Sequence, residues 1–477
     1  MTLDIELRTF LQQFHKVAEA ASQLNNSGEG PYLVDALKDH LGIVPAQVAA
    51  VSKEVVPYRF ADYDVALENL AGPDAELLGI GGDQRHHMSL ADMVSSNWAR
   101  LSTGQVDWTN VAVGPTETRR VMSLGIRLFT FEGQPVAVLQ RRASQMHGNG
   151  TGVIEVLCPD PDVANALLER ATTLGTELSL LRGKVLSLEM VGYEAEGDGF
   201  RFIARPDLPA EDVILPPGVL ERITGHISGI AAHSETLRRH GQHLKRGVLL
   251  YGPPGTGKTH TIRHLISTTP EHTVILLSGQ TLQFIGQAAA IARHLQPSIV
   301  VLEDCDLVAM NRDLSPTGNP LLFEVLDALD GLDADADVAF LLTTNRVDVL
   351  EEALTQRPGR VDLAVEIPVP DEEARRRLLA LYCGSVGYSD EVLDEMAARS
   401  DHLTASFFKE LMRRSVLLAA EQDEEPTDGH LREAMESLLA DQNTLNRTLH
   451  PGGHFDDFEP DGDTEGEIGT GAYHPMY

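Results

Sequence analysis

Two short groups of residues in the second half of the chain have the types and spacing that phosphate chemistry needs. Residues 252–259 read Gly-Pro-Pro-Gly-Thr-Gly-Lys-Thr and satisfy the pattern G-x-x-x-x-G-K-[ST]. The glycines let backbone N–H groups surround phosphates at a helix N-terminus, Lys258 brings a cation to the β- and γ-phosphates, and the Thr259 hydroxyl can bind Mg²⁺. The residues expected to bind ATP are Gly252, Pro253, Pro254, Gly255, Thr256, Gly257, Lys258 and Thr259.

The local context of this phosphate-binding loop (P-loop) supports the interpretation. An apolar run at residues 248–251 precedes it and predicts a strand, and residues 259–267 after it are compatible with a helix. A random chain of this length would match the pattern at a rate on the order of one in a hundred, and the strand–loop–helix order lowers that further. We therefore expect ATP and Mg²⁺ as cofactors.

A second group, Glu303 and Asp304, follows the apolar run at residues 298–302. A carboxylate at the end of a buried strand can join a Mg²⁺ shell, and its neighbour can activate the attacking water. Acidic residues after a strand are also common in solvated loops. Their place one strand–helix unit after the P-loop is what favours hydrolysis.

The overall charge restricts the possible partners. The formal net charge is −33, from 71 acidic and 38 basic residues, so most of the surface repels phosphate backbones and a nucleic-acid partner is not expected. No apolar run approaches the roughly 18 residues that span a bilayer, and the first residues do not resemble a signal peptide. Three widely spaced cysteines form neither a disulfide framework nor a metal box. We expect a cytoplasmic protein without a membrane span.

The first part of the chain predicts an α+β domain. Residues 3–22 have the spacing of an amphipathic helix, residues 126–131 and 135–139 read as a hairpin, and residues 153–157 read as a further strand. A helix is expected at residues 162–182, with Asp160 or Asp162 as its cap. A proline-rich connection after residue 205 marks a domain boundary.

The second part predicts an α/β fold, because short, nearly all-apolar runs alternate with helical segments. Such runs suit strands buried on both faces of a parallel sheet. The strands are expected at residues 248–251, 273–277, 298–302, 338–342 and 363–367. The predicted domains are an N-terminal α+β substrate or partner domain (1–205), a nucleotide-binding subdomain (206–370), a helical lid (371–440) and an acidic disordered tail (441–477).

Further motifs resemble the AAA clade of the AAA+ ATPases over roughly residues 212–439. Residues 343–346 (Thr-Thr-Asn-Arg) and 357–362 (Arg-Pro-Gly-Arg-Val-Asp) are similar to the second region of homology of that clade. The resemblance implies that Asn345 polarises the lytic water and that Arg357 and Arg360 reach the γ-phosphate bound by a neighbouring subunit. It also implies a homo-oligomer, a hexameric ring, in which residues 371–439 form the lid.

The chain departs from the clade's pattern in two places. The usual Asp-Glu order is inverted to Glu303-Asp304, which gives Glu303 the metal-shell role and Asp304, shorter by one methylene, the role of base. Some members of the clade share this inversion, so we expect activity. The lid has Thr404-Ala405-Ser406 where many members have Gly-Ala, and no lid arginine for the phosphates is evident.

The segment at residues 278–286 bears on what hydrolysis could drive. Phe284, Ile285 and Gly286 resemble the pore loop with which ring-shaped unfoldases grip polypeptide. The alternative is that Phe284 packs against the start of its own helix. The pore-loop interpretation predicts an ATPase that remodels or unfolds an unidentified protein client. The competing hypothesis is a nucleotide-gated adaptor or assembly scaffold with slow turnover.

Other side chains carry weaker signals. His86 and His87 lie in a polar cluster with Asp83, but adjacent histidines rarely share a metal ion. We interpret Trp98 and Trp108 as packing residues. No protease motif occurs, and the last residue, Tyr477, is one position off the docking tails of related ATPases.

Overall fold

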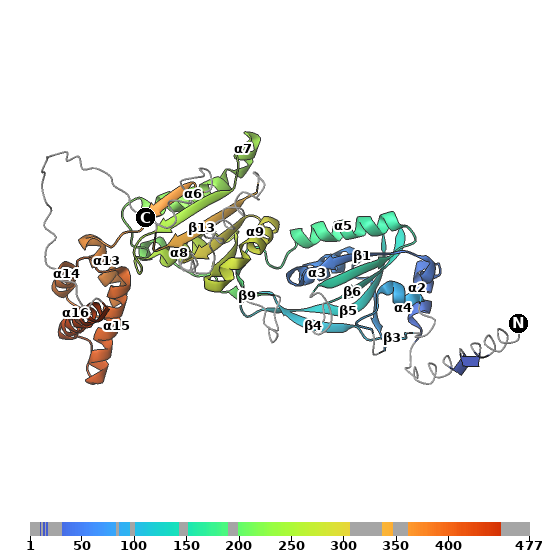
Figure 1. Cartoon of the computed structure of the whole chain (residues 1–477), viewed down its shortest axis with the longest axis horizontal. Helices are drawn as coiled ribbons and strands as arrows, with labels where there is room; N and C mark the ends of the chain where they lie inside the picture. The colour runs from blue at the N-terminus through green and yellow to red at the C-terminus, as the bar shows by residue number, and fades with distance from the viewer. Residues whose placement is uncertain are drawn as a thin grey trace, which may run out of the picture. The chain divides into compact units, whose positions relative to one another are not determined.

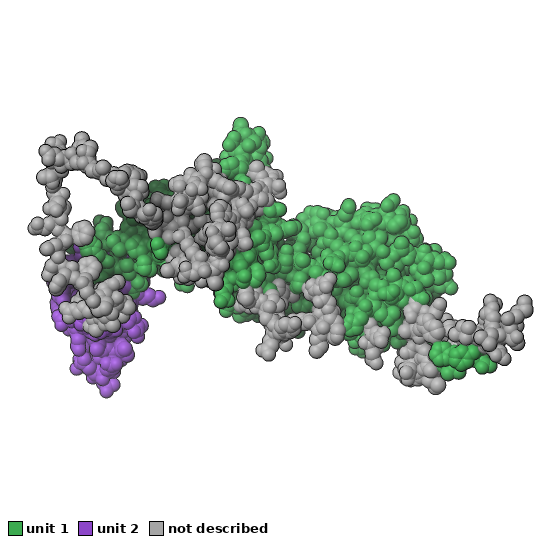
Figure 2. Space-filling view, in the orientation of Figure 1, with its two compact units in different colours: residues 1–374, 402–406 green, residues 375–401, 407–477 purple. Residues whose placement is uncertain are grey.

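The computed structural model describes residues 10, 13, 14, 16, 17, 31–82, 85–95, 101–142, 151–188, 199–305, 336–346 and 361–449. The chain forms two compact units (Figure 2). One contains residues 1–374 together with 402–406, and the other contains residues 375–401 and 407–477. Of the helix predicted at residues 3–22, the described residues are helical, and the remainder lies outside the described residues.

The first part of the chain folds around an antiparallel sheet (Figure 1). In the described residues the strand order is β1-β7-β6-β5-β2-β3, with β4 paired to the long strand β5. The elements are α2 (Leu33–Leu41), β1 (Ala50–Val55), α3 (Phe60–Ala71), β2 (Glu76–Ile80), α4 (Leu90–Ser95), β3 (Thr103–Gly104), β4 (Asp107–Ala112), β5 (Thr118–Phe131), β6 (Gln134–Arg141), β7 (Gly152–Leu157) and α5 (Pro161–Glu177). Short 3₁₀ turns lie at Pro45–Gln47 and Pro57–Arg59.

The predicted hairpin, strand and helix of this region are confirmed. Strands β5 and β6 pair through the two-residue turn Glu132-Gly133, whose φ angles are 50° and 78°, as a type I′ turn requires. The Asp160 side chain caps α5 by accepting a hydrogen bond from the Asp162 N–H at 2.9 Å. The helix ends at Glu177, five residues before the predicted end at 182.

Helices cover both faces of this sheet. Along β6, Val136 and Val138 pack with α3 and α5 in one core, whereas Ala137 and Leu139 pack with α2 and α4 in another. Successive strand residues point to opposite faces, so a strand that is buried throughout needs a layer on each side. The N-terminal domain is therefore a three-layer α+β structure.

The second sheet of the described chain has the order β14-β10-β13-β12-β11-β8-β9. Its strands are β8 (Val185–Leu188), β9 (Phe200–Ile203), β10 (Arg246–Tyr251), β11 (Thr273–Ser278), β12 (Ser298–Glu303), β13 (Val338–Thr344) and β14 (Leu363–Glu366). All five strands predicted for the α/β fold are present, and neighbours among them pair in parallel. The apolar runs therefore form the buried parallel sheet that their composition predicts.

Two strands that precede the predicted domain boundary at residue 205 belong to the second sheet. Strands β8 and β9 pair with each other, and β8 extends the second sheet alongside β11. The two strands precede the proline-rich connection, which contains only the 3₁₀ turn Ala210–Asp212. Strand pairing between segments nearly 90 residues apart depends on the folded topology, and local composition did not reveal it.

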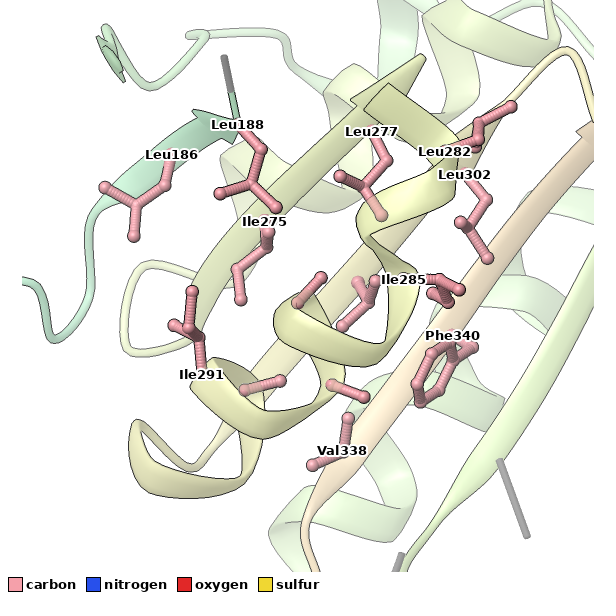
Figure 3. Packing of buried hydrophobic residues seen from close by; sticks show 14 of the residues in the cluster. Leu186, Leu188, Ile275, Leu277, Leu282, Ile285, Ile291, Leu302, Val338 and Phe340 are labelled. Atoms are coloured by element: carbon pink, nitrogen blue, oxygen red, sulfur yellow. The ribbon is translucent and has the colours of Figure 1, made fainter. Parts of the chain in front are cut away.

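Helices cover both faces of the second sheet as well. One face packs against α6 (Val219–Ala232) and α8 (Lys258–Thr268), and the other packs against the turn Gly279–Phe284 and α9 (Ile285–His294). Figure 3 shows Ile285 and Ile291 of this second layer against Ile275, Leu277 and Phe340 of the sheet. The short helix α7 (Ser234–Arg239) follows α6.

The second unit is helical, as predicted. It contains α13 (Glu372–Cys383), α14 (Asp390–Arg399), α15 (Ala405–Glu421) and α16 (Asp428–Leu449), where the first residues of α13 and α15 belong to the other unit. Helix α16 continues past the predicted boundary at residue 440, because neither glycine nor proline occurs between residues 430 and 450. None of the helices in the described ranges has both the length and the apolar character needed to cross a bilayer.

A buried polar network joins α3 to the middle of the first sheet. Arg127 donates hydrogen bonds to Asp64 and to Gln140, both at 2.6 Å, and Gln140 also donates to Asp64 at 3.1 Å. All three residues are at most 4% exposed. Since each charge and amide is satisfied within the network, removal of one member leaves the others buried without a partner.

We expect Asp64→Ala to destabilise the N-terminal domain by about 3–5 kcal/mol, because Arg127 would keep a buried charge without its carboxylate. The matched control is Glu68→Ala, one helical turn away, which breaks the exposed Arg119–Glu68 pair and should cost less than about 1 kcal/mol. Hydrogen exchange of the β5 and β6 amides in the full chain measures both effects. Equal losses for the two variants would contradict the expectation.

Candidate functional site

The P-loop leaves the second sheet at the carboxyl end of β10, between strands β13 and β14. Gly252 has a φ of 144°, and a Cβ atom at this position would lie 2.2 Å from the carbonyl oxygen of Ile367. The Ile367 N–H donates to the Tyr251 carbonyl at 2.7 Å, which fixes this close approach. A glycine is therefore required at the first position of the loop for both conformational and steric reasons.

The middle of the loop lies against residues 402–406. Gly255 has a φ of 78°, and its carbonyl accepts a hydrogen bond from the Ser406 N–H at 3.1 Å. A Cβ atom on Gly255 would lie 2.3 Å from the Ser406 hydroxyl and 2.9 Å from the Thr404 hydroxyl. The departure noted at residues 404–406 thus brings two hydroxyl groups to the P-loop.

The end of the loop begins helix α8. Gly257, with a φ of 113°, is the N-cap residue, so the first N–H groups of the helix face the loop. The Lys258 ammonium donates to the carbonyl oxygens of Gly252 and Pro253 at 2.7 and 2.8 Å, and the residue is 6% exposed. The loop therefore joins a helix N-terminus to a nearly buried cation, which is the arrangement an anionic ligand requires.

Thr259 and Glu303 meet at this site. Burial is the largest influence on the Glu303 carboxyl and raises its pKa above the usual value, whereas the nearby Thr259 hydroxyl lowers that pKa. The nearby charge of Asp304 raises it further, and Arg263 lowers it. A hydroxyl and a carboxylate in contact are hard oxygen donors of the kind that Mg²⁺ prefers, so these residues fit the predicted ion. No cluster of three metal-ligating side chains occurs among the described residues, and a shell completed by phosphates and water does not need one.

Asp304 occupies an unusual backbone conformation. Its φ is 52°, a left-handed value that aspartate tolerates better than most residues. The Asp304 N–H donates to the Thr343 hydroxyl at 2.9 Å, and the Cys305 N–H donates to the Thr343 carbonyl at the same distance. The sequence marked Thr343 only as part of a motif, whereas the structure reveals that it holds the turn that follows Glu303.

Asn345 lies at the same edge of the sheet. Strand β13 runs between β10 and β12, and Thr344 is the register partner of Tyr251, so Asn345 and Gly252 leave their strands at the same level. The Thr344 hydroxyl accepts a hydrogen bond from the Arg346 N–H at 3.0 Å and shapes this turn. The P-loop, Glu303, Asp304 and Asn345 thus meet at the carboxyl end of three adjacent strands.

Comparisons with known proteins agree with this arrangement. Residues 248–369 match the family described as "ATPase family associated with various cellular activities (AAA)". The chain therefore contains an AAA ATPase domain. The matched residues begin within β10 and end just after β14, so β8 and β9 lie outside the match.

The similarity to curated proteins covers more residues than the AAA family match. A proteasome-activating nucleotidase of Methanocaldococcus jannaschii is 31% identical over 255 residues, which is 49% of this chain and 58% of that protein. The corresponding nucleotidase of Methanosphaerula palustris is 29% identical over 259 residues, covering 50% and 62% of the two chains. A probable 26S proteasome regulatory subunit 6B of Caenorhabditis elegans is 29% identical over 205 residues, covering 40% and 49%. The chain thus spans between about half and three fifths of these relatives.

Two of the predicted catalytic residues, Arg357 and Arg360, lie outside the described residues. Asp83, Trp98 and the tail from residue 450 also lie outside them. The predicted roles of the two arginines therefore remain predictions.

The residues of the predicted pore loop lie at the start of α9, and their contact with a client stays a prediction. Ile285 is 1% exposed and belongs to the core between α9 and the sheet, so it cannot touch a polypeptide in this conformation (Figure 3). Phe284 is partly buried and packs against the same core, whereas Gly286 is exposed. The sequence alternative, in which Phe284 packs at the start of its helix, agrees with these contacts.

The N-terminal domain also differs from expectation at Trp108. This residue is 41% exposed on β4, and the Arg120 guanidinium lies over its ring at 4.8 Å from the centroid. It is therefore a surface residue, and it packs against Arg120 in a cation–π contact and not in the core. Nearby, Arg85 and His86 lie against Asp107, at 3.1 and 3.7 Å.

We expect Gly252→Ala to abolish detectable ATP binding, because the added Cβ atom would collide with the backbone of Ile367 at the base of the P-loop. The matched control is Gly286→Ala on α9, where no atom lies within 4 Å of the new methyl group and φ is not left-handed. Titration with a fluorescent ATP analogue measures both. Unchanged affinity in Gly252→Ala would contradict the assignment of the loop.

Proposed function

We propose that the AAA domain binds ATP with Mg²⁺ and hydrolyses it. The observation that carries this proposal is the closeness of the Thr259 hydroxyl, at the start of α8, to the Glu303 carboxylate, at the end of β12, whose pKa that hydroxyl lowers. It joins the two sequence motifs into one site that offers a cation, a helix N-terminus and hard oxygen donors. A chance glycine-rich loop has no reason to lie against an acidic residue from another strand.

Each residue of the site has a proposed role in ATP hydrolysis. Lys258 and the loop N–H groups bind the phosphates, while Thr259 and Glu303 would hold Mg²⁺, which would supply positive charge against the charge that develops on the phosphate oxygens. Asp304 accepts the proton of the attacking water, and Asn345 orients that water from the adjacent strand. The hydrogen bond from Asp304 to Thr343 restrains the backbone that carries the base.

We further propose that the active unit is a homo-oligomer, a hexameric ring with sites shared between subunits. The named relatives, proteasome-activating nucleotidases and a 26S proteasome regulatory subunit, favour this and suggest a protein client that is remodelled or unfolded. In such a ring Arg357 and Arg360 would reach the γ-phosphate bound by a neighbour. The net charge of −33 argues against nucleic acid as the client. A reducing, cytoplasmic location agrees with the absence of disulfides among the three described cysteines.

We expect Asp304→Asn to lower the rate of ATP hydrolysis by about 10²–10⁴-fold while ATP still binds, because the amide cannot accept the proton of the water. Glu303→Gln is the matched comparison and should raise the Mg²⁺ concentration needed for half-maximal activity. Phosphate release and binding of a fluorescent ATP analogue are measured for both. Full turnover in Asp304→Asn would remove Asp304 from the mechanism.

Mixing the Asp304→Asn and Arg360→Ala chains tests the shared site. Each variant alone should be inactive, but mixed rings contain sites with an intact Asp304 from one subunit and an intact Arg360 from its neighbour. A partial return of ATP hydrolysis on mixing is therefore expected. No recovery in mixtures that form verified mixed oligomers would contradict an arginine supplied in trans, without affecting the assignment of Asp304.

The buried position of Ile285 and the packing of Phe284 favour a second candidate, a nucleotide-gated adaptor or assembly scaffold that does not thread polypeptide. A threading loop needs side chains that are exposed to the client. In the packed conformation these two residues instead support α9 against the sheet.

The variant Phe284→Ala separates the two candidates. If Phe284 only packs, the variant should lose about 1–2 kcal/mol of stability and keep any effect on protein substrates at permissive temperature. If it grips polypeptide, ATP hydrolysis should persist while ATP-dependent unfolding of a destabilised fluorescent reporter protein is lost. Gln287→Ala, an exposed position on α9, is the control and should change neither quantity.

A further inference from the structure

Three nitrogen-containing side chains gather at the end of the second sheet that is opposite the P-loop. Arg246 is the first residue of β10, whose last residue leads into the P-loop. His272 directly precedes β11, and His226 lies on α6, which packs on the same sheet. None of the three belongs to the ATP site, and the sequence analysis did not select any of them.

Several polar atoms of this cluster are buried without a hydrogen-bond partner. The Arg246 side chain is 0% exposed, and its Nη1 donates to Asp337 at 2.7 Å and to the Leu244 carbonyl at 2.9 Å. In the part of the chain that the structure describes, Nε and Nη2 of Arg246, both ring nitrogens of His272 and Nε2 of His226 have no partner. A buried polar group without a hydrogen-bond partner costs folding free energy. An added charge at this end of the second sheet, which we call its base, would therefore destabilise the fold further.

The charges around the two imidazoles come from several elements. For His272, burial lowers the pKa most, the Arg246 charge lowers it further and Arg205 adds to this, while Asp337 and Glu271 act in the opposite direction. For His226, burial again lowers the pKa most, Asp362 raises it and Arg246 lowers it. In both cases the net direction is downward, which agrees with the burial of the rings beside a guanidinium.

We propose that Arg246, His226 and His272 form an acid-sensitive lock at the base of the nucleotide-binding sheet. Two neutral imidazoles fit beside the buried guanidinium and let α6, β10 and β11 pack together. Protonation of either ring would place a second cation near the buried Arg246 guanidinium, and among the described residues Asp337 is the acidic side chain that pairs with Arg246 directly. The lock therefore loosens in acid and closes again on neutralisation, which makes the stability of the AAA domain depend on pH.

The direction of the effect follows from proton binding. Above about pH 6.5 both rings are neutral in the folded and unfolded chains, and the lock contributes fully. As the pH falls below that value, the unfolded chain takes up protons that the folded chain resists. The folding equilibrium then weakens by up to about tenfold per pH unit for each histidine, until the lowered folded-state pKa is reached.

Hydrogen exchange of β10 and β11 amides in the full chain, at pH 7.5, 6.5 and 5.5 and corrected for intrinsic exchange rates, tests the proposal. In the unsubstituted chain the protection of these strands should fall steeply between pH 6.5 and 5.5. The double variant His226→Gln/His272→Gln should lose most of this fall, and each single variant should lose part of it. If the double variant does not fold, His226→Gln alone decides the outcome, because that residue is only half-buried.

His264→Gln is the matched control. His264 is 4% exposed on α8 in the same domain, but its Nδ1 pairs with the Leu208 carbonyl at 2.8 Å. This variant should keep the pH dependence of the unsubstituted chain. The proposal is overturned if the histidine variants retain the full fall in protection, or if His264→Gln removes it equally. ATP binding at pH 7.5 should stay unchanged in His226→Gln, so this result is independent of the proposed ATP hydrolysis.

Discussion

The candidate site depends on one topological constraint, the position of β13 between β10 and β12. Parallel strands end at the same edge of a sheet, so this order brings three different turns together. The P-loop contributes phosphate-binding groups, the turn after β12 contributes carboxylates, and the turn after β13 contributes an amide. Thr343 on the middle strand then ties the second turn to the third by accepting the Asp304 N–H. The site is assembled by strand order and needs no flexible loop to bring its parts into place.

Because helices bury both faces of each sheet, polar side chains are few in the interior of the described structure. The N-terminal sheet and the nucleotide-binding sheet are each covered by helices on two faces, and polar residues within them occur as paired networks or at strand ends. The Asp64–Arg127–Gln140 network is fully paired, whereas the cluster around Arg246 is not. The first network stabilises the N-terminal domain, and the second is the cluster for which we propose a response to pH.

The amino-acid sequence predicted those features that depend on local pattern. The all-apolar runs became the parallel strands, and Gly252, Gly255 and Gly257 adopt left-handed conformations that few other residues allow. The sequence did not predict the features that depend on contacts between segments far apart in the chain. Nothing local in β8 indicates that it pairs with β11, and the residues around Phe284 fit a packed helix start as well as an exposed loop. Trp108 was interpreted as a packing residue, and its exposure is decided by its place on β4.

The addition of β8 and β9 to the second sheet has a consequence for how the domain can be divided. Strand β8 pairs with β11 in parallel, and β9 closes the far side of β8. A shortened chain that began at the proline-rich connection would lack both strands and would leave the N–H and C=O groups of β11 without their neighbour. Open strand edges recruit other chains, so such a fragment would be prone to aggregate even with its entire P-loop present. A fragment that keeps this strand pairing therefore has to begin before Val185, ahead of the predicted boundary at residue 205.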